Sequence, residues 1–511
     1  MCELSTASPL KLYIIAGEAS GDAIGAKVIR ALQRQEQAQT LEFRGIGGSH
    51  MSNAGFKSLF PMQELSVMGL LEVVPHLWRL RRRVYDTVRD IEAFQPALVL
   101  TIDSKGFAFR VLKALQAREQ QTGGKRIKKA HYVAPSVWAY KKRGKLDSAK
   151  LRQLLDIMFA ILPFEEDIFH GGEDSRNVQG SGDNKLNQSW CHFVGHPAVE
   201  DFLEANKVYD SKQSVLVMPD EYLPEPEIST GTDALLDFSK YNPVDLLARA
   251  RLFQRLAASG REDRVSDSVR ENLGIPVGAF VICALVGSRA NEVQKCLHLV
   301  LDGIELFRQK KNAQHEKPIF VVFPTISAVK EQVNGHISAM EALSVSCRVM
   351  TDLDSVSRFR LFQSSDAAVA VSGTIVLEAA LANLPTVVVY RANRLTEWIA
   401  QWLAAVRFVS VPNLLLGRLL IPELLFSDCT ALKIAETLTK LQRQSPNQKD
   451  ESDLAMAAST LTKWLEPNGT SVASTNVQPI RASDLVAKYI LEVLAEKEPQ
   501  QSTGSKVVLE A

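Results

Sequence analysis

Paired cysteines, net charge and long apolar runs are all scarce in this sequence. Its 511 residues include six cysteines, none of them in a Cys-x-x-Cys pair or at a spacing typical of metal ligands. We therefore expect reduced thiols, no metal site and no disulfide framework, as in a reducing compartment. Lys and Arg total 59 against 58 Asp and Glu, so the formal net charge is +1 and no global field attracts nucleic acid.

No stretch reaches the roughly 18 uninterrupted apolar residues that a membrane-spanning helix needs, so any membrane contact is expected to be peripheral. Only Met1 to Pro9 precede the first apolar run, which is too short for a secretory signal or a transit peptide. The sequence therefore predicts a soluble protein whose targeting segment is either absent or missing from this chain. Its length is sufficient for two or three domains.

Apolar runs alternate with helical periodicity in two separate blocks of the chain. In the first block the candidate strands are 12–16, 42–46, 97–102, 129–133, 157–161 and 192–194. In the second block they are 280–285, 319–323, 348–351, 367–371 and 386–390. Strands that alternate with helices in this way predict a parallel sheet in each block, covered by helices on both faces.

The predicted fold class is therefore α/β, with two doubly wound Rossmann-like domains that face a central cleft, as in B-type (GT-B) glycosyltransferases. Residues 209–241 are rich in Asp, Ser, Pro and Gly, which indicates a linker between the blocks. The predicted division is a first domain at 10–203, an inserted and partly disordered linker at 204–271, a second domain at 272–425, C-terminal helices at 426–494 and a disordered tail at 495–511.

The first strand leads directly into an acidic loop. Gly17 and Gly21 flank Glu18 and Ser20, and Asp22 follows. In open parallel sheets, ligands bind beyond the carboxyl ends of the strands, so this loop lies where a ligand would. The alternative is a plain strand-to-helix turn in which Ser20 or Asp22 caps the helix.

A glycine turn in the second block has the form of a phosphate site. Gly287-Ser288-Arg289 follows a strand and precedes a helix, and Glu292 lies in the first turn of that helix. Free amides at a helix N-terminus and a nearby guanidinium suit a diphosphate. Without that role, Ser288 would cap the helix and Arg289 would be solvated.

A second turn, Ser372-Gly373-Thr374, has the same order of strand, turn and helix. Glu378 follows Thr374 by four residues and so lies one turn along the same helix face. Its carboxylate can accept hydrogen bonds from the 2′ and 3′ hydroxyls of a ribose, or it can simply face solvent. The two turns together predict nucleotide binding.

The motifs of both blocks resemble the lipid-A-disaccharide synthase family. The strings that carry the resemblance occur in the family's order and are Gly17-Glu18-Ala19-Ser20-Gly21-Asp22, Val67-Met68-Gly69, Ile102-Asp103, His131-Tyr132-Val133-Ala134-Pro135-Ser136-Val137-Trp138-Ala139, Leu162-Pro163-Phe164-Glu165, Phe193-Val194-Gly195-His196, Gly287-Ser288-Arg289, Ser372-Gly373-Thr374 and Val409-Ser410-Val411-Pro412-Asn413-Leu414-Leu415. The resemblance covers about 12–425 apart from the linker, and the string that begins at His131 is too specific for chance.

The resemblance implies an inverting glycosyltransferase that needs neither metal nor cofactor. Such an enzyme joins UDP-2,3-diacylglucosamine to 2,3-diacylglucosamine 1-phosphate (lipid X) through a β-1,6 bond and releases UDP, which gives lipid A disaccharide 1-phosphate. The first domain would then be the acceptor side and the second would bind the UDP-sugar. The expected partners are these substrates and a membrane surface. Nucleic acid is not expected as a partner, and the sequence does not decide whether the protein forms a homodimer.

By the same resemblance Asp103 is the catalytic aspartate, as the general base for the acceptor hydroxyl or as the group that orients the base, with Glu18 as the competing carboxylate. The alternative for Asp103 is a helix cap. Asn413 matches another functional position, although it could equally be an ordinary turn asparagine. The residues expected to bind the UDP-sugar are Gly287, Ser288, Arg289, Glu292, Ser372, Gly373, Thr374, Glu378 and Asn413.

An apolar and aromatic stretch runs into a basic cluster between 70 and 83. This pattern suits a helix that lies in a membrane interface beside anionic lipid and contacts acyl chains. A core helix with one solvated basic face is the alternative. The expected acyl or membrane contacts are Leu70, Leu71, Val74, Leu77, Trp78, Arg81, Arg82 and Arg83.

The chain departs from the bacterial pattern at Lys105 and Gly106, beside the presumed base, and at Val286, where a proline commonly stands. These changes put turnover and acceptor preference in question. The long linker resembles that of plant members, which act in organelles. The expected location is therefore the cytoplasmic face of a membrane for a bacterial-type enzyme, or the mitochondrion for a plant-type enzyme without its transit segment.

Two other classes of function remain open at this point. One is another UDP-sugar enzyme of the same fold, such as a UDP-N-acetylglucosamine 2-epimerase, although a soluble sugar nucleotide needs no apolar stretch like that at 70–83. The other is a non-catalytic relative that binds UDP or lipid. The intact Asp103 and Glu18 argue against the non-catalytic alternative, whereas Lys105 and Gly106 support it.

Overall fold

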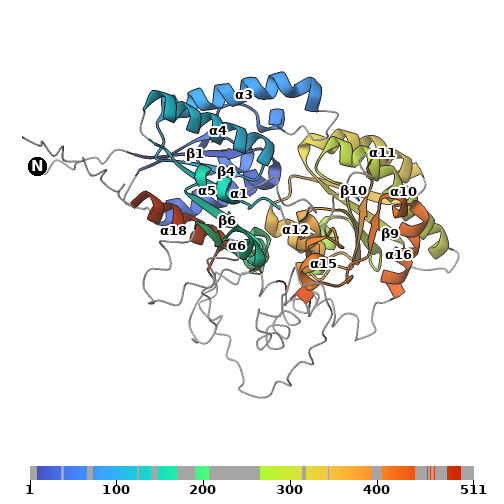
Figure 1. The fold of residues 1–511 in the computed structure, drawn as a ribbon. Helices are drawn as coiled ribbons and strands as arrows, with labels where there is room; N and C mark the ends of the chain where they lie inside the picture. Colours follow the sequence, from blue (N-terminus) through green and yellow to red (C-terminus); the bar gives the residue numbers. More distant parts are fainter. Residues whose placement is uncertain are drawn as a thin grey trace, which may run out of the picture.

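The computed structural model describes residues 9–35, 40–65, 73–123, 126–136, 139, 148–170, 190–206, 265–312, 318–342, 345–392, 397, 406–443, 457–458, 461, 465 and 480–495. These residues form two α/β domains, the first blue to green and the second yellow to orange in Figure 1. Most of the predicted linker and nearly all of the predicted tail lie outside the described residues.

The first domain contains a sheet of seven parallel strands in the order β3-β2-β1-β4-β5-β6-β7. Strand β1 has β2 on one side and β4 on the other, so the direction of winding reverses between β1 and β4. The strands are β1 (Leu10–Ala16), β2 (Leu41–Ile46), β3 (Phe56–Ser58), β4 (Leu98–Ile102), β5 (Lys128–Tyr132), β6 (Ile157–Ala160) and β7 (Cys191–Phe193).

The second domain contains a parallel sheet of six strands in the order β10-β9-β8-β11-β12-β13. Its reversal lies between β8 and β11, at the place that corresponds to β1 and β4 in the first sheet. The strands are β8 (Phe280–Leu285), β9 (Ile319–Thr325), β10 (Ser346–Thr351), β11 (Ala367–Val371), β12 (Thr386–Tyr390) and β13 (Glu423–Leu425).

These two sheets confirm the predicted fold of two doubly wound domains, and β8, β11 and β12 have the predicted bounds. Strands β3 and β13 were not predicted. Each has three residues and lies at an edge of its sheet. So short a strand has too few side chains to show an alternating pattern.

Helices cover both faces of the first sheet because inner strands such as β1 are apolar on both faces. Tyr13 and Ile15 pack into one core with α3 and α4, while Leu12 and Ile14 pack into another with α1 and α18. The helices of this part of the chain are α1 (Ala19–Gln35), α2 (Ser49–Ser52), the short 3₁₀ helix η1 (Met62–Leu65), α3 (Val73–Phe94), α4 (Lys105–Thr122), α5 (Ser148–Leu154), α6 (Pro163–His170) and α7 (Pro197–Ala205).

The second sheet is enclosed in the same way. Ile282 and Ala284 share a core with α10, α11 and α16, and Val281 and Cys283 share one with α12, α13 and α15. The helical segments are α9 (Val265–Asn272), α10 (Ala290–Asn312), η8 (Ser327–Val329), α11 (Lys330–Ala342), α12 (Ser355–Gln363), α13 (Thr374–Leu381), α15 (Val411–Leu416), η9 (Phe426–Asp428), α16 (Ala431–Arg443) and α18 (Ala482–Ala495).

Two helices pack on the domain opposite to the one that their place in the chain suggests. Helix α7 follows the last strand of the first sheet, yet its Val199 and Phe202 pack in the core of the second domain against α12 and α13. Helix α18 comes from the far end of the chain and packs against α1 of the first domain (Figure 1). The chain therefore crosses between the domains twice, and these helices tie the domains together.

Candidate active site

The predicted catalytic loops follow neighbouring strands of the first sheet. Glu18 comes after β1 and Asp103 comes after β4, at the point where the winding reverses. The loops are in direct contact, because a Cβ atom on Gly17 would lie only 2.3 Å from Oγ of Ser104. Gly17 therefore allows the two carboxylate-bearing loops to approach each other at the usual place for a ligand in such a sheet.

The backbone beyond β4 and β5 adopts conformations that non-glycine residues rarely use. Asp103 and Ser104 have φ angles of 48° and 47°, and the β-branched Val133 has 72°. The amide of Asp103 donates to the carbonyl of Tyr132 at 3.0 Å, which joins these two strand ends. Backbone of this kind costs free energy and is concentrated at functional sites. This supports a functional role for the Asp103 loop rather than a simple cap.

Lys105 lies beside Asp103 at the start of α4. Burial lowers the pKa of its ammonium, and the nearby carboxylates of Asp103 and Glu165 act in the opposite direction. The departure from the bacterial pattern therefore places a positive charge next to the presumed base.

In the second domain, the turn after β8 is shaped around an internal carboxylate. Gly287 has a φ of +101°, and a Cβ there would lie 2.7 Å from Oε2 of Glu292. That oxygen accepts the amides of Ser288 and Arg289 at 3.2 and 3.3 Å. Glu292 thus occupies the amides at the start of α10 that were predicted to hold a phosphate.

Arg289 joins this turn to the first domain. Its Nη1 lies 2.8 Å from Oε1 of Glu292, and its Nη2 lies 2.5 Å from Oε2 of Glu18. Burial alone would lower the pKa of the guanidinium, yet Glu18 and Glu292 together hold it above its ordinary value. The structure therefore brings the acidic loop of one sheet against the turn of the other that was predicted to bind a diphosphate.

The second glycine turn leaves Gly373 and Thr374 exposed, with nothing within 4 Å of a Cβ on Gly373. Glu378, one turn further along α13, is instead only 9% exposed, and its Oε2 lies 2.5 Å from Nε of Arg358 on α12. Burial raises the pKa of Glu378, and Arg358 partly offsets this. A ribose would have to share or replace Arg358 to reach this carboxylate.

The prediction for Asn413 is not supported by its surroundings. Asn413 belongs to α15, and its side chain has 0% exposure and bonds to the turn before β13. Its Oδ1 accepts the amides of Leu420 and Ile421, and its Nδ2 donates to Ile421 O and Glu423 Oε1. All its hydrogen-bonding capacity is used within the protein. In this structure the side chain therefore holds the turn before β13 to α15, and it offers no free donor or acceptor to a ligand.

Asp22 holds the acidic loop from inside the first domain. Its buried carboxylate accepts the amides of Gly48, His50 and Met51 at 2.8 to 3.0 Å, and so it caps α2 rather than its own helix. The partner helix lies 26 to 29 residues further along the chain, which is why sequence reasoning about local capping did not find it.

The predicted membrane contacts on helix α3 differ in their exposure and in their partners within the protein. Trp78 is 77% exposed, and Arg81 and Arg82 are also exposed. Arg83 instead lies 2.7 Å from Glu64 and stacks over the ring of Phe60, so its charge has partners within the protein. Leu70, Leu71 and the side chains of Val74 and Leu77 lie outside the described residues.

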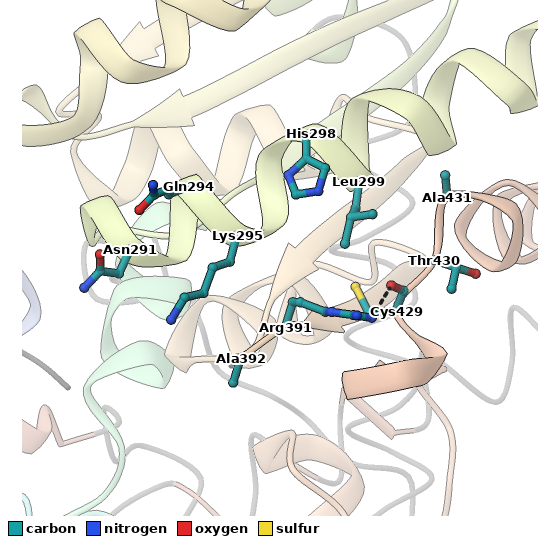
Figure 2. A pocket seen from close by; sticks show the side chains of 10 residues that line it. All are labelled: Asn291, Gln294, Lys295, His298, Leu299, Arg391, Ala392, Cys429, Thr430 and Ala431. Carbon is teal, nitrogen blue, oxygen red and sulfur yellow. Dashed lines mark hydrogen bonds between the residues drawn. The ribbon is translucent and has the colours of Figure 1, made fainter. Parts of the chain in front are cut away.

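A pocket of about 670 Å³ opens between α10 and the start of α16 (Figure 2). Arg391 lines it, but its Nη1 donates to the carbonyls of Phe426 and Cys429 at 2.8 and 3.4 Å, which ties the end of β12 to the connection before α16. All its lining residues belong to the second domain, and none is a predicted site residue. The predicted site residues therefore lie outside this pocket.

Within the part of the chain that the structure describes, no three His, Cys, Asp or Glu side chains gather in a way that could hold a metal ion. The same residues contain no helix long and apolar enough to span a bilayer.

The sequence matches the family model described as lipid-A-disaccharide synthetase over residues 12–224 and 258–475. The chain belongs to this family. The unmatched residues 225–257 lie inside the segment predicted as a linker.

Individual relatives agree with this assignment. The chain is 35% identical over 436 residues to the lipid-A-disaccharide synthase of Granulibacter bethesdensis, covering 85% of this chain and 87% of that protein. It is 30% identical over 495 residues to the probable mitochondrial lipid-A-disaccharide synthase of Arabidopsis thaliana, covering 94% and 90%. Family membership makes the protein an enzyme of the glycosyltransferase class.

Solved structures support the fold independently. UDP-GlcNAc 2-epimerase from Neisseria meningitidis, bound to UDP-GlcNAc, superposes with a TM-score of 0.50 at 12% identity, covering 94% of this chain and 100% of that one. The S. aureus MnaA-UDP structure gives the same TM-score and identity over 96% and 98%. At this level of identity the likeness shows a shared two-domain architecture.

Proposed function

We propose that this enzyme is an inverting glycosyltransferase that joins UDP-2,3-diacylglucosamine to lipid X through a β-1,6 bond, forming lipid A disaccharide 1-phosphate and UDP. The observation that carries the proposal is the contact of Glu18 with Arg289 at 2.5 Å. It brings together a carboxylate loop for the acceptor and a cationic turn for the donor, within one family whose named members are lipid-A-disaccharide synthases.

The chemistry divides between the two domains. The acceptor 6-hydroxyl attacks the anomeric carbon of the donor from the side opposite to UDP. As the new bond from that carbon to O6 forms, its bond to the phosphate oxygen breaks, and the electron pair leaves with UDP. The carboxylate of Asp103 takes the hydroxyl proton. Arg289 and the amides of Ser288 and Arg289 stabilise the charge that develops on the diphosphate.

The positive charge for the leaving group comes from the protein itself, so we propose that the reaction needs neither a metal nor a cofactor. Arg289 supplies a permanent charge, and α10 begins at the turn that carries it. In this proposal the exposed Gly373 and Thr374 contact the sugar or a phosphate, and Glu378 contacts the ribose once Arg358 shares it.

We further propose that α3 docks the enzyme on a membrane. Trp78, Arg82, Tyr85 and Arg89 are exposed, and their spacing places them on one face of the helix, with Arg81 beside them. An aromatic and basic face of this kind matches an anionic lipid surface, where both acylated substrates reside. The named relatives include bacterial proteins and a mitochondrial plant protein, so either membrane is consistent with this role.

The test is to incubate the purified protein with both substrates, without added metal and with a chelator present, and to follow UDP and the lipid product by mass spectrometry. The expected result is equal release of disaccharide 1-phosphate and UDP. Release of UDP without disaccharide would indicate hydrolysis or another acceptor. Conversion of UDP-GlcNAc to its 2-epimer would establish the alternative enzyme, and UDP binding with no turnover would establish the non-catalytic relative.

Amide variants distinguish between the two candidate bases, Asp103 and Glu18. Asp103→Asn should lower kcat by about 100-fold or more while UDP still binds, because the proton acceptor is lost but the donor turn is intact. Asp302→Asn removes an equal charge from an exposed position on α10 and should leave kcat unchanged. Near-normal turnover in Asp103→Asn would transfer the role of base to Glu18.

A further inference from the structure

In this structure carboxylates already occupy the donor turn, which is the turn Gly287-Ser288-Arg289. Arg289 offers two guanidinium nitrogens and its own amide, and Ser288 offers a second amide. Glu292 takes both amides and Nη1, and Glu18 takes Nη2. The four donors suited to a diphosphate are thus held by two carboxylates, one from the same helix and one from the facing domain.

These contacts are of a kind that a ligand can replace. The side chains of Arg289, Glu18 and Glu292 are 31%, 25% and 19% exposed, so water and ligand reach them. Ion pairs with this exposure contribute little net free energy, because solvent competes for each partner. A diphosphate presents charged oxygens at two adjacent phosphorus atoms, and it can take over both carboxylate positions as one ligand.

We infer that Glu18 and Glu292 are exchangeable internal anions that stand in for the two phosphates, and that Glu18 is the residue that makes the turn discriminate between a nucleoside diphosphate and a monophosphate. A monophosphate can displace one carboxylate and leaves the other on Arg289. Only a second phosphate reaches the position of Glu18. This inference rests on the proposed function, since it concerns the donor side of the same site.

The exchange has a consequence for the acceptor side. Glu18 crosses from the first domain, so the diphosphate that displaces it also breaks the direct contact of the acidic loop with the donor turn. The displaced carboxylate then lies free beside the Asp103 loop, which Gly17 and Ser104 hold close by. Donor binding therefore prepares the acceptor side, and the donor should bind before the acceptor.

The experiment is titration calorimetry of UDP and UMP with the full chain and three variants. Glu18→Gln and Glu292→Gln keep the side-chain shape and remove one competing charge each. Asp302→Asn on the exposed side of α10 is the charge-matched control. Circular dichroism and the thermal midpoint verify that each variant is folded.

Both glutamate variants should bind UDP about three- to tenfold more tightly, as expected when the competing partner of a partly exposed ion pair is removed. In Glu18→Gln the gain for UDP should exceed the gain for UMP, and the control should differ from wild type by less than about twofold. Unchanged or weaker UDP binding by Glu18→Gln, with normal binding by wild type, would overturn the inference and leave the proposed function intact. No UDP binding by wild type and control would overturn the proposed function and the inference with it.

Discussion

Helix α1 and the residue before it make ion pairs with charges that lie far along the chain, and two of these pairs differ in burial rather than in length. Glu18 meets Arg289 at 2.5 Å with side chains 25% and 31% exposed. Two turns further along, Lys27 meets Asp201 of α7 at 2.7 Å with side chains only 13% and 11% exposed. Lys27 also donates to the carbonyl of Pro197 at 3.1 Å.

The difference in burial separates a contact that fixes the domains from one that ligands can exchange. Burial alone would lower the pKa of Lys27, but Asp201 and Glu200 hold it above its ordinary value, so the ammonium stays charged. A buried charge cannot leave its partner without an uncompensated desolvation cost. The Glu18 pair has solvent as an alternative partner, and its arginine lies in the turn that suits a diphosphate.

The largest expected effect comes from breaking the buried pair. Lys27→Met leaves the Asp201 carboxylate without its cation and should lower the free energy of unfolding by about 3 kcal/mol or more, measured by urea denaturation. The double variant Lys27→Met/Asp201→Asn removes both charges and should recover part of that loss. A loss below about 1 kcal/mol in the single variant would place this pair in the same class as the exposed one.

Acid should weaken the same buried junction. His196 caps α7 by accepting the amide of Ala198 at 3.1 Å, and burial, followed by Lys27, lowers its pKa to about 3, with Asp201 opposing. Between that value and the unfolded pKa of about 6.5, only the unfolded chain binds the proton, so stability falls as the pH falls. From pH 7 to pH 5 this residue should account for a loss of about 2 kcal/mol.

His196→Asn tests this, because Asn also caps helices but does not titrate. Its urea-unfolding free energy at pH 5 should fall less than that of wild type by about that amount. His131, whose pKa burial and then Lys105 also lower to about 3, is present in both proteins, so the difference isolates His196. Equal acid sensitivity in the two proteins would contradict the prediction.

Basic side chains within α3 also differ, in this case in whether they have a carboxylate partner or are exposed beside an aromatic ring. Arg83 is paired with Glu64, whereas Arg81 and Arg82 are exposed beside Trp78. Arg81→Ser/Arg82→Ser should weaken sedimentation with anionic liposomes by about 1 kcal/mol per arginine, without changing stability. Lys310→Ser/Lys330→Ser on the second domain is the matched control. If the α3 variant sediments as wild type does, α3 is a core helix with one solvated basic face and does not contact the membrane.

The smallest expected effect on stability belongs to the exposed pair. Glu18→Gln should change the free energy of unfolding by less than about 1 kcal/mol, because Arg289 keeps Glu292 and gains water. Urea denaturation of Glu18→Gln and Lys27→Met in parallel compares the contributions of the two ion pairs to stability directly. A loss as large as that of Lys27→Met would show that the Glu18 contact fixes the domains too.

Most of the fold was predictable because doubly wound sheets leave a strong pattern. Strands such as β8 and β11 are apolar on both faces and end at glycine turns, so their bounds followed from the residues alone. The edge strands β3 and β13 were too short to predict. The side on which α7 and α18 pack was not predictable either, because an amphipathic helix shows which face is buried but not against which partner.

The sequence by itself determined the two α/β domains, the positions of Glu18, Asp103 and Arg289 at strand ends, and the resemblance to the family, because these depend on local order along the chain. Only the tertiary structure decided which charges meet. Glu18 and Arg289 are 271 residues apart, Asn413 of α15 bonds to the turn before β13, and Glu378 is held by Arg358. Such pairings depend on how the two sheets and their helices pack. A local sequence pattern does not show which distant residue a side chain will contact.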